Sequence, residues 1–325
     1  MFIKVLDFLK LSVQDSETIT RLYEDSRLTS IHYKERLIKF KNSTKCGGYI
    51  QYSETKTWNG IEFCFCSNHL DIKIKPHYLF NDWKHNADDF SIADCVQTLW
   101  LLVNEFNLSP TDLRVMQIEY GFNFISPIPV QDLIASLEYH ERNRFDSSND
   151  GLKFSKVSGK VSPRGTLSRY KRIKLYAKGI QQPLYADENL IRFEIHSDRT
   201  NFIESLGIYT LKDILEYHPY EILANSLREE FQKILFLDYD NSCNNLTQSE
   251  KKKVQEFNNP RHWYRAIQAH RNTFNNNKKS YLNLLDKTGE NIHRKLHILV
   301  NEKIEKLLKP CAILTPSENI NLVQF

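Results

Sequence analysis

Cysteine, glycine and proline are scarce in this chain of 325 residues, which has six, ten and ten of them. The cysteines are scattered, and charge interrupts the first residues too often for a signal peptide, so we expect reduced thiols and no disulfide framework. No stretch approaches 18 uncharged apolar residues, so we expect no membrane-spanning helix. The sequence therefore predicts a cytoplasmic protein without a membrane partner.

Several common catalytic and nucleotide-binding motifs are also absent. The sequence has no P-loop, G-x-G-x-x-G, G-x-S-x-G or H-E-x-x-H pattern, which excludes the nucleotide-dependent enzymes and hydrolases that those motifs mark. Hydrophobic residues make up 41% and charged residues 26% of the chain, a composition typical of a folded globular protein. The net charge of +4 is too small to identify a partner, so the distribution of charge matters more.

The hydrophobic periodicity changes along the chain. The first hundred residues alternate apolar and polar positions, with a hairpin signal at Asn59-Gly60, which predicts strands joined by turns. A helix is expected over 88–106, where apolar residues fall at helical spacing. Further strands are expected at 114–124, 172–176 and 190–196, and helices at 130–140, 210–216, 219–236, 248–257, 260–273 and 289–308.

These elements predict an α+β fold. We expect residues 1–215 to form a domain on a mainly antiparallel sheet with flanking helices, and residues 216–325 to form a helical domain. Basic and aromatic residues occur together over 259–265, which suits DNA contact or oligomerisation, including a homodimer. The alternative is a helical bundle whose aromatic residues fill its own core.

One tight cluster of metal-ligand residue types is present, Cys64-x-Cys66-x-x-His69. On a strand, the two cysteines would lie on the same face. No second cysteine pair completes a zinc set, so packing within a sheet is the favoured interpretation and a metal site is the alternative.

Residues 151–180 carry nine Lys or Arg and no Asp or Glu. Phosphates are the natural complement of such a cluster, because each neutralised phosphate releases a counterion. The sequence therefore predicts DNA contact here, against the alternative of an ordinary solvated basic loop. The expected DNA-binding residues are Lys153, Lys156, Lys160, Arg164, Arg169, Lys171, Arg172 and, on the following strand, Arg192.

Two carboxylates, Glu119 and Glu194, are flanked by apolar residues on expected strands. If the strands are neighbours, the two acids could converge on a hard divalent cation, which prefers oxygen ligands. The alternative is that each acid pairs with a basic residue across the sheet. Tyr176 ends the basic strand, and a phenol becomes a useful nucleophile where cations such as Lys174 and Lys178 stabilise its phenolate.

The order of these segments resembles a known family. An acidic strand at 117–123, a Lys-x-Tyr-x-Lys strand at 174–178 and an Arg-Phe-Glu strand at 192–194 follow one another as in the rolling-circle replication initiators of plasmids and the gene II proteins of filamentous phages. The likeness covers residues from about 110 to 215. In that family a tyrosine attacks one strand at the replication origin, becomes joined to the 5′ phosphate and leaves a 3′ hydroxyl.

The resemblance implies a DNA-nicking and joining enzyme of a plasmid, phage or other mobile element, acting on an origin as a single strand or hairpin. Tyr176 would be the nucleophile, with Tyr170 in reserve, and Lys174 or Lys178 would stabilise the phosphate. Glu119 and Glu194 would hold Mg²⁺ or Mn²⁺. Conjugative relaxases share the pattern, so replication and mobilisation are both open.

Two positions depart from the family pattern. Ala177 stands where the family often has an acid after the tyrosine, and Asn123 stands where the first strand has its second acid. Asp198 is a candidate to complete the metal site. The alternatives to a nicking enzyme are a non-catalytic DNA-binding regulator on the same fold and a helical interaction protein whose basic strand faces solvent.

Overall fold

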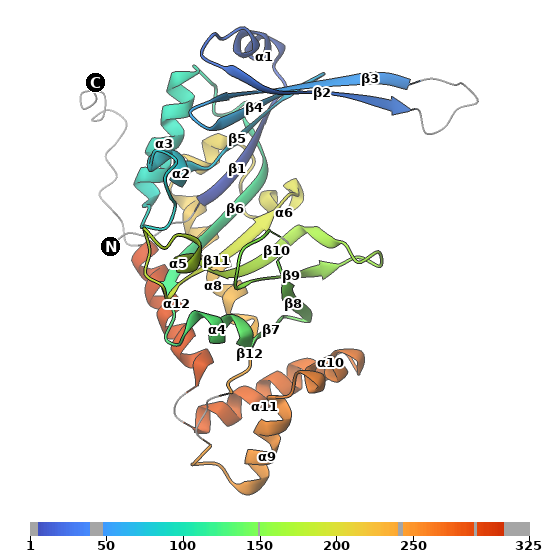
Figure 1. Ribbon diagram of the computed structural model, residues 1–325, viewed down its shortest axis with the longest axis vertical. Helices are drawn as coiled ribbons and strands as arrows, with labels where there is room; N and C mark the ends of the chain where they lie inside the picture. Colours follow the sequence, from blue (N-terminus) through green and yellow to red (C-terminus); the bar gives the residue numbers. More distant parts are fainter. Residues whose placement is uncertain (1–5, 40–47, 149, 240–242, 289–290, 309–325) are drawn as a thin grey trace.

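The structure is a computed structural model that describes residues 6–39, 48–148, 150–239, 243–288 and 291–308 (Figure 1). Its centre is a twelve-stranded sheet with the order β12-β7-β8-β9-β10-β11-β6-β1-β5-β4-β3-β2, and each recorded pair of neighbours is antiparallel. The strands are β1 (Leu6–Val13), β2 (Thr29–Lys39), β3 (Gly48–Trp58), β4 (Ile61–Cys66), β5 (Leu70–Ile74), β6 (Arg114–Ile125), β7 (Leu137–His140), β8 (Asn143–Ser147), β9 (Ser155–Val161), β10 (Leu167–Ala177), β11 (Leu190–Ser197) and β12 (Ile234–Phe236).

Helices flank the sheet and make up most of the chain after β11. They are α1 (Ser16–Tyr23), α2 (Pro76–Phe80), α3 (Ile92–Glu105), α4 (Val130–Ser136), α5 (Lys178–Gln181), α6 (Thr200–Ser205), α7 (Leu211–Ile214), α8 (His218–Gln232), α9 (Gln248–Phe257), α10 (Pro260–Gln268), α11 (Thr273–Lys287) and α12 (Ile292–Leu308). Within the described ranges, no helix combines the length and the apolar character needed to cross a membrane. The predicted α+β class with a mainly antiparallel sheet and a helical C-terminal region is confirmed.

The two faces of the sheet differ because apolar and polar residues alternate along its strands. Apolar side chains of one face share a core with helical residues such as Leu99 of α3 and Val300 of α12. The ring of Phe193 on β11, for example, lies 5.2 Å from that of Phe231 on α8. The opposite face carries polar and charged side chains, and it is the face that holds the candidate site.

Local signals explain several elements. The turn at Asn59-Gly60 joins β3 to β4, and both residues have positive φ, 43° and 72°, as a two-residue hairpin turn requires. Ser91 and Asp94 form a capping box at the start of α3, because each side chain accepts a hydrogen bond from the other's backbone N–H. The hairpin and the helix expected at these positions are therefore confirmed.

Several predicted boundaries were wrong, two of them because strand pairing replaces the end of an expected helix. The helix expected over 130–140 ends at Ser136, and the helix expected over 219–236 ends at Gln232. The residues that follow these two helices form β7 and β12, which pair with each other. The helix expected over 260–273 is divided into α10 and α11. Pairing between segments about a hundred residues apart overrides the local helical pattern.

The hydrophobic packing continues across residue 215. Residues of α8, β12 and α12 belong to the same core as the strands of the sheet. A second cluster lies among α9, α10 and α11, with Trp263 fully buried at its centre, and includes Tyr139 of β7. The aromatic residues of this helical part therefore fill its own core to a large extent, and the division of the chain at residue 215 stays a prediction.

Two hairpins, β2–β3 and β9–β10, project from the same side of the molecule (Figure 1). In the sheet order, β11, β6, β1, β5 and β4 lie between them. The hairpins are therefore two arms on either side of the central strands.

A buried acid joins α8 to the sheet. One carboxylate oxygen of Glu230 lies 2.8 Å from both His140 Nε2 and Lys171 Nζ, and the other lies 2.7 Å from Lys233 Nζ. Burial acts to raise the pKa of Glu230, but the hydrogen bonds from these three partners outweigh it and hold the pKa well below its usual value. Glu230 therefore stabilises the fold in its ionised form.

We expect Glu230→Gln to lower the free energy of unfolding by about 1 to 2 kcal/mol at pH 7, because Lys171 loses its acidic partner while Lys233 keeps its ion pair with Glu141. Since the folded-state pKa is depressed, this stability is present above the unfolded-state pKa of about 4.3 and is lost as the pH falls further. Urea unfolding of the variant and the parent should therefore differ most at neutral pH. Glu229→Gln, at an exposed neighbouring position, is the control; an equal effect at both positions would contradict the assignment.

Candidate active site

Three carboxylates from adjacent strands meet on the polar face of the sheet. Asp7 comes from β1, Glu119 from β6 and Glu194 from β11, which are consecutive in the sheet order. Their ligand oxygens all lie within 4.8 Å of one another. Asp7 and Glu194 are buried, with 5% and 3% of their surface exposed, and Glu119 is half-buried. The structure thus brings together the two predicted acids and adds a third.

Local backbone features bring these acids together. The pairing of β1 with β6 shifts register between Leu6 and Phe8, which are the neighbours of Asp7. Gly121 pairs with Glu194 across β6 and β11. A Cβ atom at Gly121 would lie 2.2 Å from the carbonyl oxygen of Phe193 and 3.0 Å from Glu194 Cγ. Glycine therefore allows the close approach of the strand that carries Glu194.

The phenol of Tyr176 is bonded directly to this acidic cluster. Its hydroxyl donates a 2.7 Å hydrogen bond to Glu194 Oε1 from the neighbouring strand β10. Tyr176 is 4% exposed, and its surroundings are polar on the hydroxyl side. Burial, followed by the charge of Glu194, raises the pKa of Tyr176 well above its ordinary value. The phenol is therefore neutral in this arrangement.

Three basic residues, Lys174, Lys178 and Arg192, border the tyrosine and the acids. Lys174 Nζ lies 4.4 Å from the centre of the Tyr176 ring and also pairs with Asp150 at 2.5 Å. Lys178 is almost fully buried and donates to Asn86 Oδ1 at 2.5 Å and to Gln181 Oε1 at 2.7 Å. Burial, and then the charge of Arg192, lower the pKa of Lys178 to about 6. Near neutral pH, Lys178 is thus largely uncharged.

Arg192 is fully buried beside the acids. Its guanidinium group lies 3.3 Å from Asp7 Oδ2 and 3.6 Å from Glu194 Oε1, and it donates to Asn123 Oδ1 at 2.7 Å. In this conformation it offers no surface to a DNA phosphate, so its place differs from the DNA-binding role predicted for it. A buried guanidinium needs acidic partners, and these acids supply them.

The two other residues considered for the metal site have different partners. Asn123 accepts a hydrogen bond from Arg192 and donates one to the carbonyl oxygen of Ala87 at 3.0 Å. An ionised carboxylate at this position would have no N–H to donate to Ala87. Asp198 pairs with Arg172 at 2.6 Å and with His196, which also lies 2.9 Å from Glu119. Burial opposes a charged imidazole, but the bonds to Glu119 and Asp198 raise the pKa of His196.

The predicted DNA-binding residues separate into two groups. Lys153, Lys160, Arg164 and Arg169 are exposed, and no ion pair with another described residue engages them. Lys156, Lys171 and Arg172 are half-buried: Lys156 donates to the carbonyl oxygens of Ala135 and Leu137, and the other two pair with Glu230 and Asp198. The reserve nucleophile Tyr170 is exposed and packs edge-on against Phe202.

Sequence reasoning missed Asp7 and Asn86. Asp7 stands in Leu6-Asp7-Phe8-Leu9-Lys10-Leu11, an alternating pattern with an acid among apolar residues, which is the same signal that singled out Glu119 and Glu194. Asn86 lies in the segment after α2 and contacts Asp7, Lys178 and Arg192. Nothing in its local sequence indicates that role.

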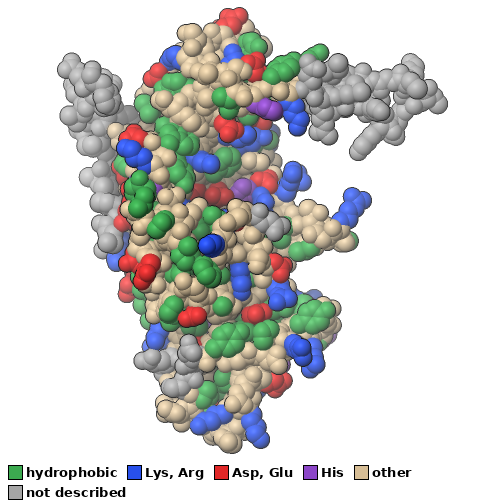
Figure 2. All heavy atoms as spheres, viewed as in Figure 1, with side chains coloured by type: hydrophobic (Ala, Val, Ile, Leu, Met, Phe, Trp, Pro, Cys, Tyr) green, Lys and Arg blue, Asp and Glu red, His purple; other side chains and the backbone are tan. Residues whose placement is uncertain are grey.

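The donor set suits a hard divalent cation. Three carboxylates supply only oxygen ligands, which Mg²⁺ and Mn²⁺ prefer. Arg192 compensates one of the three negative charges, and Lys178, with its pKa lowered to about 6, adds little more. The cluster therefore keeps an excess of negative charge. On the molecular face of Figure 2, acidic and histidine side chains gather at mid-height, with Lys and Arg around them and on the projecting hairpin.

In comparisons with known proteins, no family model, no curated protein and no solved structure matches the chain.

Proposed function

We propose that this protein nicks and rejoins one strand of DNA through a covalent tyrosine intermediate, as a rolling-circle initiator or a related mobile-element nickase does. One observation carries the proposal: the hydroxyl of Tyr176 lies 2.7 Å from a carboxylate of a three-acid cluster whose oxygens lie within 4.8 Å of one another. A nucleophile, a proton acceptor and a cation site are thus adjacent, beside an exposed basic hairpin.

In the cleavage step, Tyr176 Oη attacks the phosphorus of the scissile phosphodiester. A bond forms between Oη and phosphorus, the bond from phosphorus to the 3′ oxygen breaks, and that oxygen takes up a proton from solvent to become a 3′ hydroxyl. Glu194 accepts the phenol proton, since its Oε1 already accepts the hydrogen bond from the Tyr176 hydroxyl. The charge of Arg192 favours the ionised phenol, and Lys174, whose Nζ lies 4.4 Å from the ring centre, would add positive charge over the ring. Rejoining runs the same step in reverse.

Asp7, Glu119 and Glu194 would hold Mg²⁺ or Mn²⁺. When bound, such an ion supplies a positive charge that polarises the scissile phosphate. Two neighbouring residues would orient these ligands. Arg192 pairs with both Asp7 and Glu194, and Asn86 donates to Asp7 Oδ1 at 3.3 Å, which fixes the carboxylate of Asp7.

The β9–β10 hairpin is the proposed contact surface for the DNA backbone. Its exposed cations, Lys160, Arg164 and Arg169, are free of ion pairs with other described residues, so neutralising phosphates does not break an existing bond. We expect Arg164→Ala to weaken binding to all sequences by a similar factor and to lower the slope of log K against log salt by about 1. Fluorescence anisotropy at several salt concentrations measures this slope.

Lys252→Ala on α9 is the control for the hairpin, because Lys252 is equally exposed but lies far from it in the chain. Its salt slope should equal that of the parent protein. If the salt slope falls for Lys252→Ala and not for Arg164→Ala, the DNA binds the helical region and not the hairpin.

The second candidate function is a non-catalytic DNA-binding regulator on the same fold. The 4% exposure of Tyr176 favours it, because a phosphodiester must reach the phenol for chemistry to occur. A pool of random single-stranded oligonucleotides, incubated with the protein and Mn²⁺ and run on a denaturing gel, separates the two. A covalent protein–DNA band supports the nickase, and salt-sensitive binding without such a band in either Mg²⁺ or Mn²⁺ supports the regulator.

A further inference from the structure

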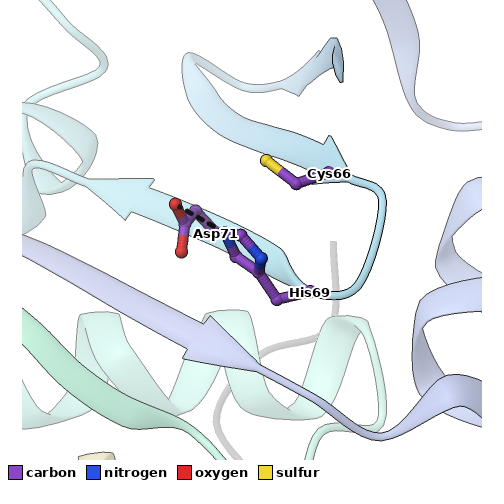
Figure 3. Close-up of side chains that lie close together, drawn as sticks. All are labelled: Cys66, His69 and Asp71. Carbon is purple, nitrogen blue, oxygen red and sulfur yellow. Dashed lines mark ion pairs between the residues drawn. The ribbon is translucent and has the colours of Figure 1, made fainter. Parts of the chain in front are cut away.

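A second group of ligand-type side chains lies on the turn between β4 and β5, away from the acidic cluster. The ligand atoms of Cys66, His69 and Asp71 all lie within 4.8 Å of one another. Figure 3 shows the three side chains converging from the end of β4 and the start of β5. The backbone N–H of Cys66 donates to the carbonyl oxygen of His69 at 2.9 Å, which closes the turn and brings residues three apart together.

The imidazole of His69 is oriented for coordination. Its Nδ1 lies 2.8 Å from Asn68 Oδ1, an acceptor, so Nδ1 carries the hydrogen. Its other ring nitrogen, Nε2, faces Asp71 Oδ2 at 3.6 Å, and in the neutral ring this nitrogen carries the lone pair that a metal ion would take. Metal-bound histidines are commonly held in this way, with one ring nitrogen donating to an oxygen and the other on the metal.

The strand geometry puts the cysteine and the acid on the polar face of the sheet. The burial of β4 alternates, with Ile61, Phe63 and Phe65 buried and the residues between them half-buried, so Cys66 lies opposite the core. Asp71 pairs in register with Cys64, which shares the face of Cys66. Lys10 Nζ, from β1, lies 2.6 Å from Asp71 Oδ2. Asp71 therefore already has a cationic partner, which a metal ion would replace.

We propose that Cys66, His69 and Asp71 form a binding site for a borderline divalent transition-metal ion of the Zn²⁺ class, distinct in ligand chemistry from the acidic cluster. A thiolate and an imidazole favour such ions over Mg²⁺, which prefers oxygen ligands alone. Three protein ligands leave the fourth position of a tetrahedral ion to solvent. Binding converts the Cys66 thiol to a thiolate, with its proton released to solvent, and transfers Asp71 from Lys10 to the metal.

The site does not depend on DNA cleavage. The metal would fix the turn that joins β4 to β5, and β4 pairs directly with β3 of the projecting β2–β3 hairpin. The ion would therefore hold the base of one arm, whether or not Tyr176 is a nucleophile.

Cobalt(II) tests the site, because a thiolate ligand gives bound Co²⁺ a charge-transfer band that carboxylates do not give. The reduced, chelator-treated full-length protein is titrated with Co²⁺ and then with Zn²⁺. We expect the band to saturate at one equivalent and Zn²⁺ to remove it. Cys66→Ser and His69→Gln should each lose the band, whereas Cys243→Ser, with its cysteine in the helical region, and Glu119→Gln should keep it. Far-ultraviolet circular dichroism checks that each variant is folded.

The proposal is overturned if the folded parent protein gives no band at one equivalent of Co²⁺, or if Cys66→Ser keeps it. Lys10→Met tests the role of Asp71. Removing the competing ammonium group should tighten Zn²⁺ binding by up to about fivefold, and an unchanged affinity would show that Asp71 is not a ligand. None of these measurements uses DNA, so their failure is distinguishable from failure of the proposed nicking activity.

Discussion

Replacing Tyr176 with phenylalanine is expected to abolish formation of the covalent protein–DNA adduct. The substitution removes one oxygen, so the rate of strand cleavage should fall by at least about 10³-fold, as for other enzymes that lose their nucleophile. DNA affinity should stay within about twofold, because the hydroxyl is bonded to Glu194 and not to the exposed hairpin. A denaturing gel measures the adduct, and fluorescence anisotropy measures binding.

Tyr170→Phe is the matched control for this experiment. Tyr170 lies on the same strand, six residues before Tyr176, but its side chain is exposed and contacts Phe202. It should cleave DNA at the parental rate. If Tyr170→Phe loses the adduct and Tyr176→Phe keeps it, Tyr170 is the nucleophile and Tyr176 is not.

Asp7→Asn is expected to have the second-largest effect, a loss of Mn²⁺ affinity by at least about 100-fold. Substituting a partner of a metal ligand already costs about 10- to 100-fold, and Asp7 would be a ligand itself. The amide oxygen of asparagine can still accept from Asn86 and Arg192, as Asp7 Oδ1 does at 3.3 and 3.4 Å, and Glu194 remains an acidic partner of Arg192. The variant should therefore fold, with a lower stability because the buried Arg192 loses one of its two charge partners. Electron paramagnetic resonance of free Mn²⁺ measures the affinity, and thermal unfolding measures the fold.

Asp132→Asn on α4 is the control for Asp7→Asn, since Asp132 is exposed and lies outside the acidic cluster. Its Mn²⁺ affinity should match that of the parent. If Asp7→Asn also binds Mn²⁺ as the parent does while Glu119→Gln and Glu194→Gln do not, the site has two carboxylate ligands and Asp7 serves only to pair with Arg192.

The sequence predicted the members of the candidate site that lie between residues 117 and 194. Glu119, Tyr176 and Glu194 each stand out locally, because a polar group among apolar neighbours on a strand needs a partner. Their strands, β6, β10 and β11, are neighbours in the sheet although β7, β8 and β9 come between β6 and β10 in the chain, and they bring these side chains to one face. Local pattern and segment order were sufficient for these three.

Asp7 was not predicted because its position depends on long-range pairing. β1 inserts between β5 and β6, and the pairing of Phe8 with Glu119 joins residues more than a hundred positions apart. An alternating pattern predicts a strand but does not name its neighbour. β7 and β12 were assigned to helices for the same reason.

Burial of charge is the other property that local sequence does not reveal. Arg192 stands on the strand that follows a segment with many cations, which led to a DNA-binding prediction, yet it is fully buried. Its burial is possible only because Asp7, Glu194 and Asn123 surround it in the fold. By contrast, Lys160 and Arg164, at the end of a hairpin, are exposed as predicted from their surroundings.

Peptide mapping of the protein–DNA adduct tests the central claim most directly. The protein is incubated with Mn²⁺ and single-stranded DNA, the adduct is digested with protease and nuclease, and the modified peptide is sequenced by tandem mass spectrometry. The account predicts a nucleotide 5′ phosphate joined to the phenolic oxygen of Tyr176. A phosphate on another residue, or no modified peptide from protein that binds the DNA, would contradict it.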